Sequence, residues 1–211
     1  LPEFLRVKVT DAYDNPIANV PVRFMVTSRR EAQGGTLDGL VDSVKVKNTD
    51  SNGFAWVQFT LGQRAGYKIN KVRASAESGG VPLSGSPLLF EITGTSTNAR
   101  KMQAVDGDDQ TGFVGQFFRN DSQVRALDEF NNPVKSQPIR ISILADPSVP
   151  AEAIGSLGIG TASDTSVYTD QFGIAAVKWR LGQLVGQHRL EASSNGAGAL
   201  QGSPMIFTAT A

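Results

Sequence analysis

Phe54-Ala55-Trp56-Val57-Gln58-Phe59-Thr60-Leu61 is the stretch that decides the fold, and it returns as Ile174-Ala175-Ala176-Val177-Lys178-Trp179-Arg180-Leu181. The odd-numbered positions of both segments are apolar, whereas Gln58, Thr60 and their counterparts are polar. Such an alternation predicts a β-strand with one face in a core and the other in water. By this reading Phe54 and Trp56 lie on the outward face.

The whole chain repeats in the same way. Three short motifs return in the same order, at intervals of 117, 120 and 117 residues: Asn15-Pro16 as Asn132-Pro133, Leu61-Gly62-Gln63 as Leu181-Gly182-Gln183, and Ser86-Pro87 as Ser203-Pro204. Two copies of roughly 100 residues each have the size of small all-β sandwiches. We therefore expect two domains, residues 1–95 and 96–211, joined by the short polar linker 94–98.

The remaining pattern is also that of an all-β protein. Further alternating or short apolar segments predict strands around residues 7–9, 22–26, 72–76 and 88–93, with equivalents in the second copy. The 22 glycines and 10 prolines lie between these segments, where turns are needed, and no segment has sustained helical spacing. Strands with one apolar and one polar face predict two antiparallel sheets packed as a sandwich.

The two copies differ at their beginnings. Residues 99–120 of the second copy would correspond to positions before Leu1, so we expect the first domain to lack its opening strand. Either the chain was cut there, or a sheet edge is left that another segment fills by strand addition. The start Leu1-Pro2-Glu3-Phe4 lacks the features of a signal peptide, so we expect a piece of a longer protein.

Composition excludes several classes of function. Twenty basic residues balance twenty acidic residues, and no basic run exceeds Arg29-Arg30, so nucleic acid and anionic lipid are not expected partners. No stretch is long and apolar enough to predict a membrane span. With no cysteine, the chain can form neither disulfides nor thiolate metal sites.

Two motifs carry a resemblance to a known family. Residues 11–24 and 49–55, followed by Ala65-Gly66, resemble the group 1 bacterial immunoglobulin-like domain, the family that includes the repeats of invasin and intimin. Residues 128–134 and 169–175 match the same motifs in the second copy, and residues 107–115 look like the family's opening strand and turn. The second copy departs at Gln137, where the family usually has a small residue.

The resemblance implies two tandem immunoglobulin-like sandwiches and a role outside the cell. Proteins of this family are typically extracellular, and rows of such domains project a tip away from a bacterial surface. It therefore implies a non-catalytic spacer or stalk in a surface or secreted adhesin-like protein. The implied partners are neighbouring immunoglobulin-like domains of the same protein, and a host or cell-surface protein or glycan.

Catalysis is not expected from the residues present. His188 is the only histidine, so a zinc site with two histidine ligands is excluded within one chain, and a Ser-His-Asp triad would have to use this residue. No phosphate-binding loop signature occurs. A carboxylate pair for glycoside hydrolysis stays open, because such pairs meet only in three dimensions.

One cluster suggests a metal. Asp106, Asp108 and Asp109 supply closely spaced oxygens that we place near the domain junction, where calcium would stiffen the linker. The full calcium-loop signature with a later glutamate is absent, so the alternative is a solvated turn and no cofactor.

Phe54 and Trp56 are the residues that suggest binding. An outward aromatic pair could stack on a sugar ring or meet a protein, whereas the alternative is that the loop 29–48 folds back and covers it. The competing hypothesis to a spacer is therefore a module that binds carbohydrate or protein through this strand face or through end loops. Assembly by strand exchange at the incomplete first sheet is a third hypothesis.

Overall fold

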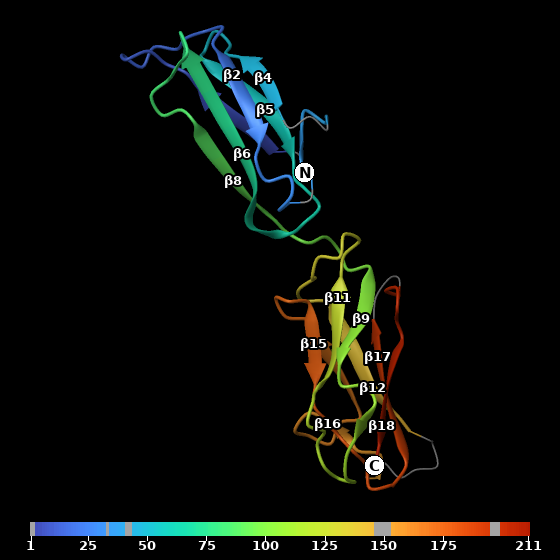
Figure 1. The fold of residues 1–211 in the computed structure, drawn as a ribbon. Helices are drawn as coiled ribbons and strands as arrows, with labels where there is room; N and C mark the ends of the chain where they lie inside the picture. Colours follow the sequence, from blue (N-terminus) through green and yellow to red (C-terminus); the bar gives the residue numbers. More distant parts are fainter. Residues whose placement is uncertain (1–2, 33, 41–43, 146–152, 195–198) are drawn as a thin grey trace. The chain divides into compact units, whose positions relative to one another are not determined.

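The computed structural model describes residues 3–32, 34–40, 44–145, 153–194 and 199–211. Every secondary-structure element named in these residues is a β-strand (Figure 1). The chain divides into two compact units, Leu1–Thr95 and Ser96–Ala211. Each unit has its own cluster of buried apolar side chains. No helix in the described part of the chain has the length and apolar character needed to cross a membrane.

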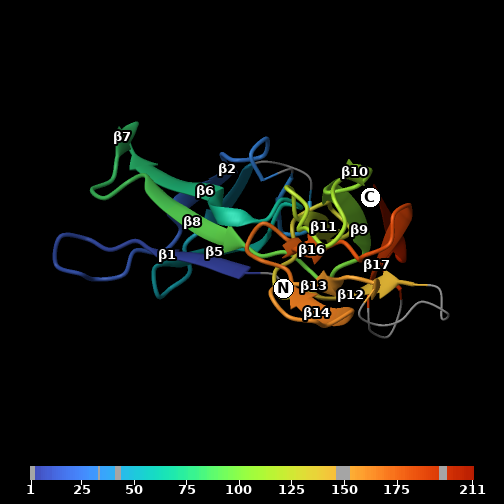
Figure 2. The same ribbon diagram turned by 90° about the horizontal axis from the view of Figure 1, so that it is seen from below.

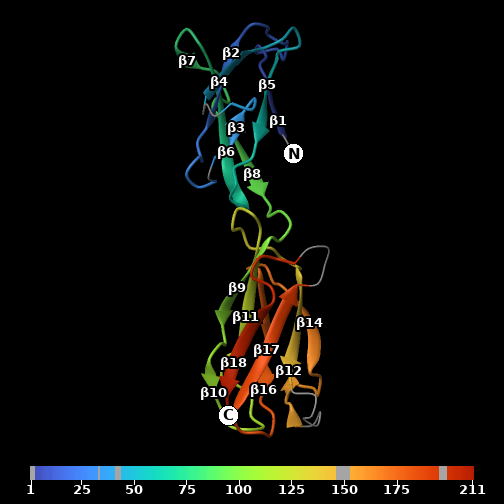
Figure 3. The same ribbon diagram turned by 90° about the vertical axis from the view of Figure 1, so that its right-hand side faces the viewer.

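The first unit is a sandwich of two sheets. One sheet has the order β1-β5-β3, and the other has the order β4-β2-β6, with β8 on the far side of β6 and β7 at the end of β6 (Figure 2, Figure 3). The strand bounds are β1 Glu3–Lys8, β2 Pro21–Val26, β3 Thr36–Leu37, β4 Val44–Asn48, β5 Phe54–Thr60, β6 Gly66–Ser78, β7 Val81–Pro82 and β8 Leu88–Gly94.

The second unit repeats this plan with added strands. One sheet has the order β15-β11-β9, the other has the order β10-β18-β17-β12-β14, and β13 pairs with β16 (Figure 1, Figure 2). The bounds are β9 Lys101–Asp106, β10 Gln110–Thr111, β11 Ser122–Leu127, β12 Pro138–Leu144, β13 Ser156–Leu157, β14 Asp164–Tyr168, β15 Ile174–Val177, β16 Trp179–Arg180, β17 Gln187–Ser194 and β18 Met205–Thr210.

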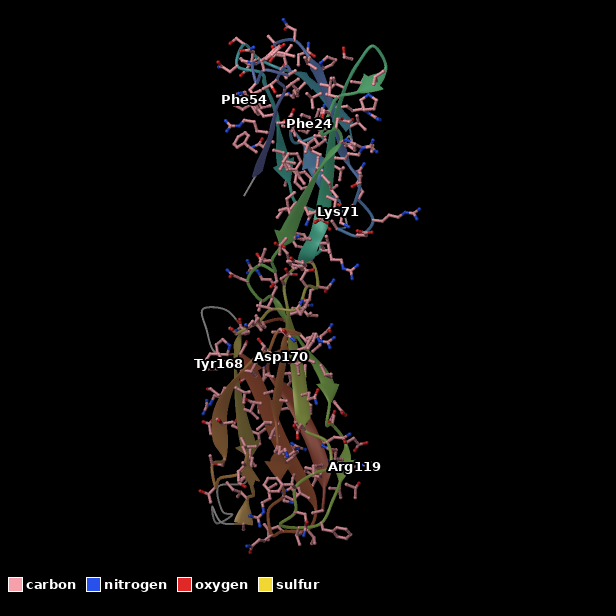
Figure 4. The ribbon with its side chains drawn as sticks, turned by 90° about the vertical axis from the view of Figure 1, so that its left-hand side faces the viewer. Phe24, Phe54, Lys71, Arg119, Tyr168 and Asp170 are labelled. Atoms are coloured by element: carbon pink, nitrogen blue, oxygen red, sulfur yellow. The ribbon has the colours of Figure 1, made fainter. Side chains whose placement is uncertain are left out.

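The predicted core faces are confirmed. On β5 the side chains of Ala55, Val57 and Phe59 are buried, and their counterparts Ala175, Val177 and Trp179 are buried in the second unit. Phe24 of β2 lies in the interior of the first unit, whereas Phe54 lies at its surface (Figure 4). Both units therefore bury the residues that period-two alternation places inside.

The repeated polar motifs form the turns between strands. The Asp50 carboxylate accepts hydrogen bonds from the backbone N–H groups of Asn52 and Phe54, at 2.9 Å each. Gly53 completes this turn with a φ of 75°. In the second unit the Asp170 carboxylate likewise accepts hydrogen bonds from the backbone N–H groups of Phe172 and Ile174. A side-chain acceptor followed by glycine at positive φ is a common way to make a tight turn, so these motifs serve the fold.

The first unit has no counterpart of two strands among its described residues. In the second unit β9 pairs with β11 and β10 pairs with β18. In the first unit β1 and β8 stand in the places of β11 and β18, and each has a strand on one side only, β5 and β6 respectively. The described part of the first unit therefore has open edges on both of its sheets.

Candidate functional site

The outward face of β1 and β5 carries an aromatic and cationic surface, which we call the aromatic face. It consists of Phe4, Arg6 and Lys8 on β1 and Phe54 and Trp56 on β5, brought together by antiparallel pairing in which Arg6 lies opposite Trp56 and Lys8 opposite Phe54. Leu5 and Val7, the alternate residues of β1, are buried and hold the strand on the core. The alternation that builds the core therefore forces these side chains outward.

Phe4 and Trp56 form the exposed part of this face. Their ring centroids lie 5.5 Å apart with an interplanar angle of 74°, an edge-to-face contact. Phe4 is 64% exposed and Trp56 is 50% exposed. The pair therefore offers a fixed aromatic surface to solvent, of the kind that stacks on a sugar ring or packs against a protein.

Phe54 lies under basic side chains. The guanidinium carbon of Arg6 is 4.5 Å from the centroid of the Phe54 ring, and the Lys8 ammonium nitrogen is 5.9 Å from it. Both distances fall in the range of cation–π contacts. Phe54 is therefore half-buried, and the solvent-facing chemistry at this end of the face is that of two cations.

The described residues of the loop 29–48, which leave out 33 and 41–43, do not cover Trp56, because half of the Trp56 side chain is exposed. The aromatic neighbour of Trp56 is Phe4, which was not predicted from the sequence. The alternation on β1 already points Phe4 outward, but only the register between β1 and β5 places it beside Trp56. That register depends on the pairing of distant segments.

Among the described residues of the second unit there is no equivalent of the aromatic face. Ala176 stands in the place of Trp56, and its cross-strand partner is Gln123. Asp121 stands in the place of Phe4, by the interval of 117 residues. The aromatic face therefore belongs to the first unit alone, whereas the turn motifs belong to both.

The three aspartates predicted as calcium ligands do not form a metal-binding cluster. Asp106 accepts the backbone N–H of Gly107, and Asp108 accepts the backbone N–H and the hydroxyl of Thr208. In the described residues, no three carboxylate or histidine side chains form a metal-binding group. The carboxylates of Asp106 and Asp108 therefore stabilise the local fold, and calcium remains an untested prediction.

The three aspartates also lie elsewhere than the sequence predicts. Asp106 ends β9, whose first residue is Lys101, so the aspartates lie a strand length of about 20 Å from the junction with the first unit. The prediction that they lie at the linker is wrong, because the opening segment runs away from the junction as an extended strand.

Sequence comparisons give no relative: no family model matches the chain, and no curated protein sequence matches it. Comparison with solved structures does give matches. InvD of Yersinia pseudotuberculosis is 16% identical with a TM-score of 0.53, and the match covers 98% of this chain and 51% of that chain. The likeness to InvD decides the fold.

The chain has an immunoglobulin-like β-sandwich fold. FdeC, described as an Escherichia coli adhesin, matches with 18% identity and a TM-score of 0.49, over 99% of this chain and 59% of that chain. The D00-D0 domain of intimin matches with 17% identity and a TM-score of 0.38, over 97% of this chain and 92% of that chain. Other matches include invasin and two glycosyl hydrolases from Bacteroides cellulosilyticus, all with TM-scores below 0.4. The chain thus spans between half and three-fifths of InvD and FdeC.

Proposed function

We propose that the chain is a structural spacer of a bacterial surface or secreted protein. The observation that carries this proposal is that the side chains repeated between the units hold turns together. The Thr49 hydroxyl donates to the carbonyl of Ile17 at 2.7 Å and accepts from the N–H of Val20 at 2.9 Å. The Thr169 hydroxyl makes the equivalent hydrogen bonds in the second unit: it donates to the carbonyl of Val134 at 2.7 Å and accepts from the N–H of Gln137 at 2.9 Å. The side chains that recur between the two units therefore stabilise the fold, as expected of a module whose function is to be stable and to span a distance.

The proposed setting is extracellular. The immunoglobulin-like fold shared with InvD supports it, as does the likeness to FdeC, which is described as an adhesin. Neighbouring immunoglobulin-like domains of the same protein are the proposed partners on either side. A protein or glycan of a host cell is a proposed partner of the complete protein.

The proposal assigns no catalytic step to the chain. The histidine that any triad would need, His188, lies on β17 with its ring nitrogen Nε2 2.8 Å from the carbonyl oxygen of Leu184. A ring held by a backbone carbonyl four residues away has a structural partner. The repeated polar side chains are likewise occupied by turns.

A display experiment tests the spacer. The 211 residues are inserted between a bacterial surface anchor and an epitope tag, and antibody binding to the tag is measured on intact cells. A spacer gives strong labelling that falls when one unit is deleted and is unchanged by Trp56→Ala. Labelling that depends on Trp56 would count against a purely structural role.

A second candidate function is binding through the aromatic face. The specific observation is the exposed Phe4–Trp56 pair, which the second unit lacks. Since Arg6 and Lys8 flank the pair, a glycan with an acidic group or an acidic protein surface fits this chemistry. The purified chain is screened on glycan and extracellular-matrix arrays beside Trp56→Ala. Tyr13→Ala, which removes an 86% exposed aromatic outside the face, is the control. Saturable binding lost only in Trp56→Ala would favour the binder.

A further inference from the structure

The second unit contains a small pocket beside β13 and β16, which pair with each other (Figure 2). Its volume is about 200 Å³, below the roughly 300–1,000 Å³ of pockets for drug-sized ligands. A space of this volume holds one small group, such as a single sugar ring. The described lining includes Gly115, Ser156, Thr161, Arg180, Leu181 and Gln183.

Three residues on adjacent segments form a row at this pocket. β13 and β16 place Ser156 opposite Arg180, and a further bridge places Arg180 opposite Phe117. Residues directly opposite each other in antiparallel pairing have their side chains on the same face, within reach of one ligand. The next pair along β13 and β16, Leu157 and Trp179, is buried in the core, so the row faces away from the core. An aromatic ring, a guanidinium and a hydroxyl therefore share one face.

The guanidinium of Arg180 is held in position by the loop before Phe117. Its Nε donates to the carbonyl of Gly115 at 2.7 Å. Gly115 is itself fixed, because its N–H donates to the carbonyl of Gly182 at 2.9 Å. Among the described residues, the two terminal nitrogens of Arg180 have no hydrogen-bond or ion-pair partner. These nitrogens form a planar fork that matches the two oxygens of a carboxylate.

Ser156 supplies a buried hydroxyl to the same pocket. The residue is only 6% exposed, and its Oγ has no hydrogen-bond partner in the described part of the chain. Buried polar atoms are nearly always hydrogen-bonded, so an unpaired hydroxyl in a pocket wall is a group that a bound molecule can satisfy. Thr161 and Gln183 add a second hydroxyl and an amide, both on exposed residues. The pocket therefore offers neutral polar groups beside a fixed cation.

These groups fit one class of ligand. Arg180 is the one cation among the described lining residues, which matches the single negative charge of a carboxylate. The hydroxyls and the amide can both donate to and accept from the hydroxyl groups of a sugar. Phe117, which is 47% exposed at the end of the row, offers an apolar face to the sugar ring. The combination of charge, hydroxyls and ring points to a sugar acid.

The first unit does not carry the same groups. Its equivalent pair is Thr36 and Thr60, which lie opposite each other on β3 and β5. Thr60 stands in the place of Arg180, by the interval of 120 residues, so this pair has no guanidinium. The charge at the pocket is therefore particular to the second unit, whereas the turn motifs belong to both.

We propose that this pocket of the second unit binds one carboxylated sugar residue, either free or at the end of a glycan. The carboxylate pairs with the guanidinium of Arg180, a sugar hydroxyl hydrogen-bonds to Ser156 Oγ, and the ring lies against Phe117. The site is separate from the aromatic face, and the proposal does not depend on the spacer role.

The test is a titration of the isotope-labelled whole chain with sodium D-glucuronate, followed through backbone amide chemical shifts. We expect saturable shifts at Gly115 and Ser156 with a Kd below roughly 10 mM. D-glucose, which has a hydroxymethyl group in place of the carboxylate, should bind at least ~10-fold more weakly. Equal binding of D-glucose or of inorganic phosphate, or the absence of saturation, would overturn the proposal.

A disaccharide that ends in glucuronate separates the two sources of the ligand. It should shift the same amides as the free acid. Tighter binding of the disaccharide would assign the pocket to the end of a glycan, and equal binding would assign it to the free acid. Shifts confined to other amides would refute the site.

Matched variants locate the binding. Arg180→Gln should weaken glucuronate at least ~10-fold, whereas Lys178→Gln, which removes an exposed cation outside the pocket lining, should not. Ser156→Ala should weaken glucuronate about 3-fold without lowering the urea midpoint, because its hydroxyl has no partner among the described residues. Trp56→Ala should change nothing, which separates this site from the aromatic face. Equal effects of Arg180→Gln and Lys178→Gln, or unchanged binding in Ser156→Ala, would count against the proposal.

Discussion

At the scale of single residues, the Asp-x-x-Gly turns show why a glycine recurs. Gly173 has φ 72°, and a Cβ there would lie 2.7 Å from the carbonyl oxygen of Ala126. Gly158 also has positive φ, 64°, but nothing lies within 4 Å of its would-be Cβ. The two positions therefore separate the cost of backbone strain from the cost of a clash.

We predict that Gly173→Ala lowers the free energy of unfolding of the second unit by about 2–4 kcal/mol, since strain and overlap add. Gly158→Ala should cost only about 1 kcal/mol, from the strain alone. Urea unfolding followed by the fluorescence of Trp179 measures both. Equal losses in the two variants would mean that contact with Ala126 is not what fixes this glycine.

Asp128 gives a prediction for pH. Its side chain is buried and accepts the backbone N–H groups of Thr97, Phe130 and Asn132. Burial alone would raise its pKa, but the side chain and backbone of Asn132 and the other donors outweigh burial, so the pKa of Asp128 is lowered. A lowered pKa in the folded state means that the carboxylate stabilises the fold above its unfolded value of about 3.9. This stabilisation is lost as the pH falls through the folded pKa.

The expected result is that Asp128→Asn loses about 1–3 kcal/mol at pH 7, and that this difference from the native chain shrinks below about pH 4. Asp11, the counterpart in the first unit, is exposed, although its pKa is also lowered, chiefly by the Asn15 side chain. Asp11→Asn is the control and should change stability less. Urea unfolding at a series of pH values measures both, and a pH-independent loss in Asp128→Asn would contradict the assignment.

At the scale of strands, the sequence predicted which side chains face the core, but not which residues lie beside each other on neighbouring strands. The alternation on β5 and β15 correctly buried Val57 and Val177, and the outward position of Trp56 followed from the same rule. The contact between Trp56 and Phe4 could not be predicted, because register is set by strands that are some 50 residues apart. The two-residue strands β3 and β13 were missed for a related reason, since they exist through pairing with β5 and β16.

The two faces of β1 give a strand-scale prediction. Leu5 is 6% exposed and packs in the core, whereas Phe4 is 64% exposed beside Trp56. Leu5→Ala should destabilise the first unit by about 2–4 kcal/mol through lost burial and a cavity. Phe4→Ala should cost less than about 1 kcal/mol, the size of one exposed aromatic pair, but should shift Trp56 emission to the red. Urea unfolding and emission spectra in a Trp179→Phe background measure both.

At the scale of the whole molecule, the repeat predicted two similar modules of which the first lacks its opening strand, and the described residues of the first unit bury a smaller apolar cluster than those of the second. The buried apolar cluster contains 12 of the described residues in the first unit and 16 in the second. Met102 and Leu200 account for part of the difference, since β9 covers one side of the second core. Repetition in sequence fixed the turn chemistry of both units, but the extent of burial depends on which strands are present at the open edges.

This difference predicts the order in which the units unfold. The two tryptophans report on one unit each: Trp56, half exposed, on the first, and Trp179, 1% exposed, on the second. With fewer buried apolar residues and open sheet edges, the first unit should unfold at the lower urea concentration. Trp179→Phe leaves Trp56 as the reporter, and Trp56→Phe leaves Trp179. The midpoint from Trp56 should be the lower of the two. Coincident midpoints would show that the smaller buried cluster of the first unit does not lower its stability.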